Sequence, residues 1–95
     1  MYIHCYRDQQ IILMYVGQAY QCCKKKSQRN EYDEQFLNLI ETTLMTCSEP
    51  TNWIIRHDYL EKKKNNWYME YFAKSSYYRL KKVAISEFLN CLEVS

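Results

Sequence analysis

Apolar side chains recur every three or four residues along most of the chain, and this is the spacing of one face of an α-helix. Asp8 and Asn30 precede two such patterns and are suitable N-terminal caps, while Pro50 marks a boundary between helices. The pair Ser75 and Ser76 can divide the last pattern into two helices. No clean strand alternation is longer than five residues. The spacing therefore predicts four helical segments, over residues 8–26, 31–47, 51–64 and 66–92.

These elements predict an all-α fold, a single compact bundle of four or five helices joined by short turns. A length of 95 residues suits one domain, so we expect a single helical domain over residues 1–95. The residues before the first pattern fit either a helical turn or a short extended arm over residues 1–7. In the first helix the predicted core-facing stripe consists of Ile12, Val16, Ala19 and Cys23.

Aromatic side chains are abundant, with ten Tyr, three Phe and two Trp. A chain this short buries only about 60–65% of the surface that its unfolded form exposes, so we expect more rings than the core can hide. Tyr and Trp are favoured at interfaces. We therefore predict a non-enzymatic protein–protein interaction module, or a small subunit of a larger complex, that binds another chain in a homodimer or a heteromeric complex. The predicted anchors form an exposed aromatic and apolar helical face, made of Tyr68, Tyr77, Tyr78, Phe88 and Leu92.

An alternative interpretation assigns the same part of the chain to nucleic acid. Residues 62–82 interleave basic side chains with rings, and cations neutralise phosphates while rings stack on bases. Against it, Trp67 and Tyr71 fall on the apolar stripe, and a net charge of +2 is small for a nucleic-acid-binding domain. The contacts that this alternative predicts are Lys62, Lys63, Lys64, Lys74, Arg79, Lys81 and Lys82.

No motif of catalysis or metal binding stands out in the sequence. The five cysteines are odd in number and follow neither a disulfide framework nor zinc spacing, so we expect free thiols. His57 lies on an apolar stripe and is predicted to be a hydrogen-bonded core histidine. One glycine cannot build a Gly-rich phosphate loop. We therefore expect no enzymatic activity, no cofactor, no metal and no small-molecule substrate.

The longest apolar run, Ile11 to Val16, has six residues, whereas a membrane-spanning helix needs about 18. A secretory signal is also not evident, because Arg7 and Asp8 precede this short run and no small-residue cleavage site follows it. We therefore expect an intracellular protein, in the cytoplasm or nucleus, that does not bind a membrane.

Overall fold

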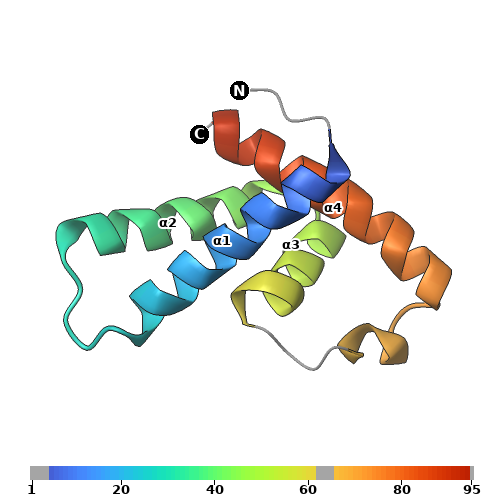
Figure 1. Cartoon of the computed structure of the whole chain (residues 1–95), viewed down its shortest axis with the longest axis horizontal. Coiled ribbons are helices and arrows are strands. Elements are labelled where there is room, and N and C mark those ends of the chain that lie inside the picture. The colour runs from blue at the N-terminus through green and yellow to red at the C-terminus, as the bar shows by residue number, and fades with distance from the viewer. Residues whose placement is uncertain (1–4, 62–65, 95) are drawn as a thin grey trace.

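The computed structural model describes residues 5–61 and 66–94, with side chains up to residue 92 (Figure 1). Within these ranges all regular elements are helical, which confirms the prediction of an all-α bundle. None of the helices described is long and apolar enough to cross a membrane. The elements are α1 (Tyr6–Lys25), α2 (Glu31–Thr46), α3 (Glu49–Ile55), the π-helix η1 (Arg56–Leu60), the 3-10 helix η2 (Trp67–Glu70) and α4 (Lys74–Val94).

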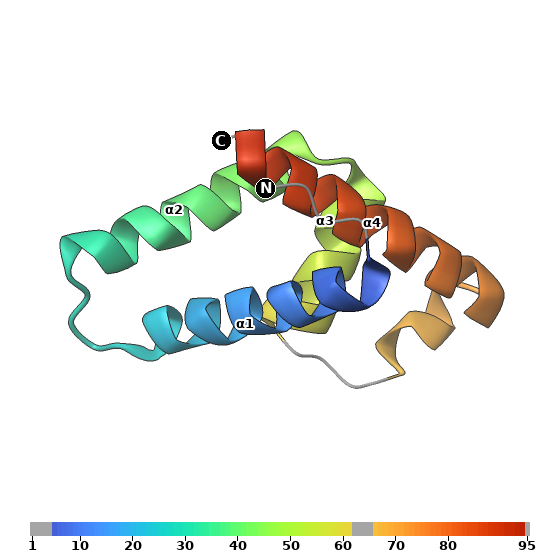
Figure 2. The same ribbon diagram turned by 45° about the horizontal axis from the view of Figure 1, so that its top comes forward.

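The bundle has a hairpin, α1 and α2, and a long closing helix, α4. Figures 1 and 2 show α1 and α2 joined at one end, with α4 crossing the other end of the hairpin. α4 packs against α1, α2, α3 and η2, and η1 packs against α1. The core therefore forms where α4 and the α3–η1 helix meet the hairpin. Its fully buried side chains include Leu13, Ile40, Leu44, Ile54, Ile55, Ile85 and Phe88.

The first helix begins earlier than the sequence predicts. Cys5 is its N-cap, and Asp8 lies in the first turn rather than at the cap. Tyr6 and Arg7 are helical, so an extended arm over residues 1–7 is wrong at these two positions, and residues 1–4 lie outside the described part of the chain. An acidic residue in the first turn still suits the helix dipole.

The core-facing stripe of α1 is rotated by one position from the predicted one. Leu13, Gly17 and Tyr20 are buried, whereas Ala19 is exposed. The cause is Gly17, which lies against the backbone of η1. A Cβ atom at this position would overlap the carbonyl oxygen of Tyr59, so only glycine lets the two helices come this close.

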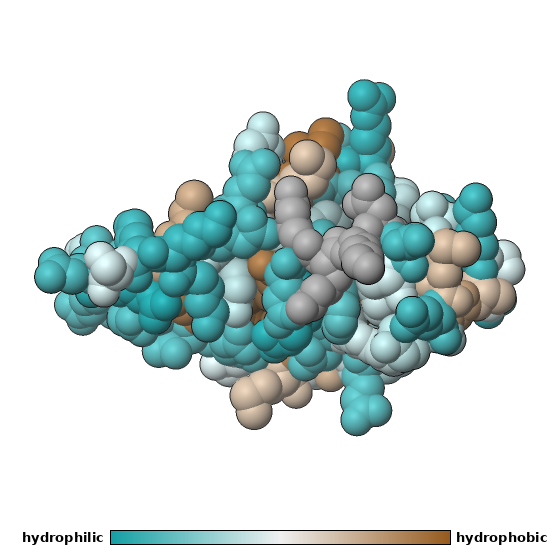
Figure 3. All heavy atoms as spheres, turned by 90° about the horizontal axis from the view of Figure 1, so that it is seen from below, coloured by the Kyte–Doolittle hydropathy of each residue, from teal (hydrophilic) through white to brown (hydrophobic). Residues whose placement is uncertain are grey.

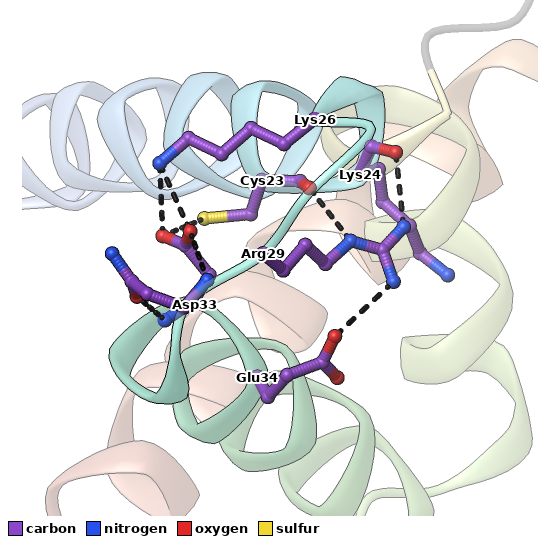
Figure 4. A network of polar contacts seen from close by, with 7 residues as sticks. Cys23, Lys24, Lys26, Arg29, Asp33 and Glu34 are labelled. Atoms are coloured by element: carbon purple, nitrogen blue, oxygen red, sulfur yellow. Dashed lines mark hydrogen bonds and ion pairs between the residues drawn. The ribbon is translucent and has the colours of Figure 1, made fainter.

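The turn between α1 and α2 is held by side chains that satisfy helix ends (Figure 4). Asn30 is the N-cap of α2, as predicted, and it forms a reciprocal pair with Asp33. The Asn30 side chain accepts from the backbone N–H of Asp33, and the Asp33 carboxylate accepts from that of Asn30. Arg29 donates to the carbonyl oxygens of Cys23 and Lys24 at 2.9 and 3.0 Å. These bonds satisfy the C-terminal carbonyl groups of α1.

The predicted helices over residues 51–64 and 66–92 begin or break at other positions in the structure. Pro50 lies in the first turn of α3, and the helix changes to π geometry at Arg56. The break in the last segment falls at residues 71–73, between η2 and α4, rather than at Ser75 and Ser76. The last segment is therefore a short 3-10 helix followed by one long α-helix.

Candidate interaction surface

Three of the five predicted anchors are core residues. Tyr68, Tyr77 and Phe88 are only 8%, 3% and 0% exposed, so the prediction that they form an exposed face is wrong. They are buried because α4 packs against α3, and because Trp67 of η2 and Tyr77 of α4 both hydrogen-bond to Asp58 of η1. Tyr78 is 49% exposed and Leu92 is half-buried, and for these two residues a role in binding stays a prediction.

A carboxylate from the π-helix accepts hydrogen bonds from two of the buried aromatic side chains. Asp58 accepts a hydrogen bond from Trp67 Nε1 at 2.8 Å and another from the hydroxyl of Tyr77. The ammonium group of Lys81 lies 3.4 Å from the same carboxylate. Tyr68 stacks flat on Tyr77, with ring centroids 3.7 Å apart. We call Asp58, Trp67, Tyr77 and Lys81 the aspartate cluster. Its polar contacts connect η2 and α4 to η1.

His57 has the structural role that the sequence predicts. Its Nε2 atom accepts from Trp53 Nε1 at 3.3 Å, and its Nδ1 atom lies 2.8 Å from the carbonyl oxygen of Trp53. Both contacts are satisfied when Nδ1 carries the proton. The ring also stacks on Trp67, with centroids 4.4 Å apart. The half-buried histidine is therefore part of the packing around the aspartate cluster.

A second polar network ties α1 and α2 to η1. The Tyr20 hydroxyl donates to Glu41 Oε1 at 2.6 Å, and Arg56 donates to the two carboxylate oxygens at 3.3 and 2.9 Å. Burial, followed by the hydrogen bond to Glu41, raises the pKa of Tyr20 to about 12. Arg56 holds the pKa of the Glu41 carboxyl below its ordinary value. The raised pKa of Tyr20 and the lowered pKa of Glu41 both indicate that the network favours a neutral tyrosine beside a charged carboxylate.

The predicted basic contacts are dispersed in the structure. Lys81 is paired with Asp58 inside the aspartate cluster, so its charge is already neutralised there. Lys82 lies over the ring of Tyr6 at 5.3 Å. Lys74 and Arg79 are exposed, so a nucleic-acid contact stays a prediction for them, but their neighbours Trp67, Tyr68 and Tyr77 are too buried to stack on bases. Lys62, Lys63 and Lys64 lie outside the described residues.

The outward face of α1 is the feature that the sequence analysis missed. Large apolar side chains are exposed at i, i+3 and i+4: Ile11 by 42%, Met14 by 52% and Tyr15 by 68%. The face continues without a charged residue, and its members are Ile11, Met14, Tyr15, Gln18, Ala19 and Cys22. A solvated helix usually carries charged residues on its outer side. The signal was present in the sequence, because residues 9–23 contain no charged side chain.

Other exposed apolar side chains do not form a comparable stripe on one helix. Three of them are on α2, but they are six or seven residues apart rather than three or four, and the others lie on η2, just after η2, and on α4. On the side of the molecule seen in Figure 3, hydrophobic atoms form small separate groups within a largely hydrophilic surface. The members of this scattered set are Tyr32, Leu39, Met45, Met69, Tyr71, Tyr78 and Val83.

Comparison of the chain with protein-family models, with curated proteins and with solved structures gave no match. Among the described residues, no group of three or more His, Cys, Asp or Glu side chains could hold a metal ion.

Proposed function

We propose that the chain is a non-enzymatic interaction module that binds another protein chain through the outward face of α1. The observation that carries this proposal is the run of exposed, uncharged positions along this helix, with Ile11, Met14 and Tyr15 at its centre. Rings and methionines are enriched, and most charged residues depleted, in the centres of protein interfaces. The predicted function is thereby kept, but the binding face moves from the last segment to α1.

The partner that this face fits best is a second copy of the chain. A two-fold interface sets each residue of the patch against the same patch, so any net charge there would meet its like. The outward face of α1 avoids this repulsion, because it has no charge. Its apolar centre, at Met14 and Tyr15, also lies at the middle of the helix, which runs from Tyr6 to Lys25. An antiparallel pair of α1 helices crossing there would bring residues 11–22 of the two chains together.

The size of the face sets the expected affinity. Residues 11–22 of the helix span about 18 Å, and a helix is about 10 Å wide, so the footprint of this face is about 180 Å² per chain. This is below the roughly 800 Å² per partner of a standard stable interface. We therefore expect reversible self-association with a dissociation constant in the micromolar range or weaker.

The test is sedimentation velocity at protein concentrations from about 5 to about 500 µM. Over this range a micromolar dissociation constant changes the fraction of chains that are dimeric. The wild-type chain should shift from monomer towards dimer as concentration rises. Met14→Glu places two like charges near the two-fold axis and should leave the protein monomeric throughout. Because Met14 is half-exposed and Glu is a good helix former, the variant should unfold within about 0.5 kcal/mol of wild type.

The matched control is Asn38→Glu, which adds the same charge at an exposed position on α2. It should associate as the wild type does. A wild-type chain that stays monomeric at the highest concentration would overturn the proposal of a second copy. A dimer that survives Met14→Glu but not Asn38→Glu would show that the face has been misplaced.

A further inference from the structure

A pocket opens between α1, α2 and η1. Its volume is about 430 Å³, and the buried side chains of Tyr20 and Leu60 are part of its wall. Pockets that bind small molecules in proteins measure about 300–1,000 Å³. The pocket shares no residue with the outward face of α1. It is therefore a separate candidate site, large enough for a small organic ligand.

The part of the pocket formed by α1 carries two ammonium groups. Lys24 and Lys25 lie in the last turn of this helix, and both line the pocket. The Lys24 ammonium group lies over the Tyr20 ring, 5.7 Å from its centroid. Arg29 donates to two carbonyl oxygens at the same helix end, so a cation already compensates the negative end of the helix dipole. Two ammonium groups in one pocket therefore favour a ligand with a doubly charged anionic group, such as a phosphate ester.

The parts of the pocket formed by α2 and by the end of η1 carry carboxylates instead. Glu41 and Glu61 line the pocket, and Arg56 nitrogens lie 2.9 and 3.9 Å from their oxygens. Glu41 accepts one hydrogen bond from Tyr20 and two from Arg56, whereas a carboxylate has about four acceptor positions. Its side chain is 38% exposed, so a hydroxyl group in the pocket can reach it. These carboxylates would repel a bare phosphate ion, but they accept hydrogen bonds from hydroxyl groups.

We propose that this pocket binds a phosphorylated polyol, which is a small hydroxylated chain or ring that carries one phosphate ester. Lys24 and Lys25 hold the phosphate, Glu41 accepts from the hydroxyl groups, and the carbon atoms lie against Tyr20 and Leu60. A sugar without a phosphate would leave the two ammonium groups unused. Inorganic phosphate would lose the contacts to Glu41. We assign binding only, and no bond is made or broken.

The openness of the site sets the expected affinity. Lys24 and Lys25 are exposed, and exposed charges interact weakly because water screens them. We therefore expect a dissociation constant of about 0.1–1 mM for a phosphorylated polyol. Removing both ammonium groups should weaken binding by about tenfold.

The test follows amide chemical shifts of the isotope-labelled chain, at one protein concentration and one ionic strength, during titration with ribose 5-phosphate, ribose or inorganic phosphate. We expect saturable shifts with ribose 5-phosphate, centred on residues 20–25, 41 and 56–61, and affinities at least about tenfold weaker for the other two ligands. The double variant Lys24→Gln and Lys25→Gln should bind ribose 5-phosphate about tenfold more weakly than wild type. The matched control, Lys74→Gln with Arg79→Gln, removes the same charge from exposed positions on α4 and should bind as wild type does.

Three results would overturn the proposal. One is wild-type protein whose shifts do not change with ribose 5-phosphate, or change only away from the pocket. Another is inorganic phosphate that binds as tightly as ribose 5-phosphate. The third is an equal loss of affinity in the lysine variant and its control, since the net charge alone would then explain binding. Met14→Glu should bind ribose 5-phosphate as wild type does, so these results do not depend on self-association through α1.

Discussion

Removing the carboxylate of Asp58 should destabilise the fold more than the loss of an ordinary surface aspartate would. The side chain is only 13% exposed, and that of its partner Lys81 is 18% exposed. Asp58→Ala leaves the Trp67 N–H and the Tyr77 hydroxyl without their acceptor, at about 1–3 kcal/mol for each buried donor. It also leaves the Lys81 ammonium unpaired, and breaking such pairs costs about 3–5 kcal/mol in fully buried sites.

These costs overlap, because Tyr77 can rotate its hydroxyl and Lys81 can extend towards water. We therefore expect a total loss of about 3–5 kcal/mol, against the roughly 5–14 kcal/mol available to a 95-residue domain. Asp58→Asn keeps the shape and one oxygen acceptor, so its cost should be about 2 kcal/mol. The control Asp8→Ala removes an exposed carboxylate from the first turn of α1 and should cost less than about 1 kcal/mol.

Urea unfolding followed by tryptophan fluorescence measures these differences directly, because Trp67 belongs to the cluster and Trp53 lies beside it. A double variant adds a second test. Lys81→Met should cost less in the Asp58→Ala background than in wild type, since it then removes a charge that has lost its partner. Two results would refute this prediction. One is an Asp58→Ala variant that unfolds no more easily than Asp8→Ala. The other is a double variant whose loss in the free energy of unfolding equals the sum of the losses of Asp58→Ala and Lys81→Met.

Two further predictions concern the contacts of α1 and η1. Gly17→Ala should destabilise the protein by about 1–3 kcal/mol in thermal or urea unfolding, because the clash with the Tyr59 carbonyl outweighs a helix-propensity gain of about 1 kcal/mol. The exposed control Ala19→Gly should lose only about 1 kcal/mol. Arg56 lowers the pKa of Glu41, so the stability from this pair is complete above the ordinary carboxyl pKa, near 4.5, and is lost as pH falls through the lowered value. Between about pH 6 and about pH 3 the melting temperature of Glu41→Gln should therefore fall by less than that of the wild type. An equal fall in the two proteins would contradict a stabilising role for the Glu41–Arg56 pair.

The helices could be predicted from the sequence because their signals are local. The spacing of apolar residues and the cap at Asn30 act within a few residues, and for α2 both are confirmed. The start of α1 was misplaced because Asp8 serves equally well as a cap or as a first-turn acid. The one-position rotation of the α1 stripe depends on the contact between Gly17 and Tyr59, 42 residues apart, which no local pattern contains.

The error over the predicted anchors has a similar cause. A count of fifteen rings predicts more aromatic surface than a small bundle can bury. The structure buries several of them by stacking rings on one another and by giving their polar atoms buried partners, as Asp58 does for Trp67 and Tyr77. Among the described residues the strongly exposed rings reduce to Tyr15, Tyr32, Tyr71 and Tyr78. A partner is therefore indicated by the faces that remain uncharged and exposed, and not by the number of rings.

Amide chemical shifts of the isotope-labelled chain, recorded as the protein is diluted, test the proposed function most directly. The account predicts concentration-dependent shifts centred on residues 11–22 of α1, and their loss in Met14→Glu. Shifts that remain constant at every concentration, or that centre on α4 and spare α1, would contradict it.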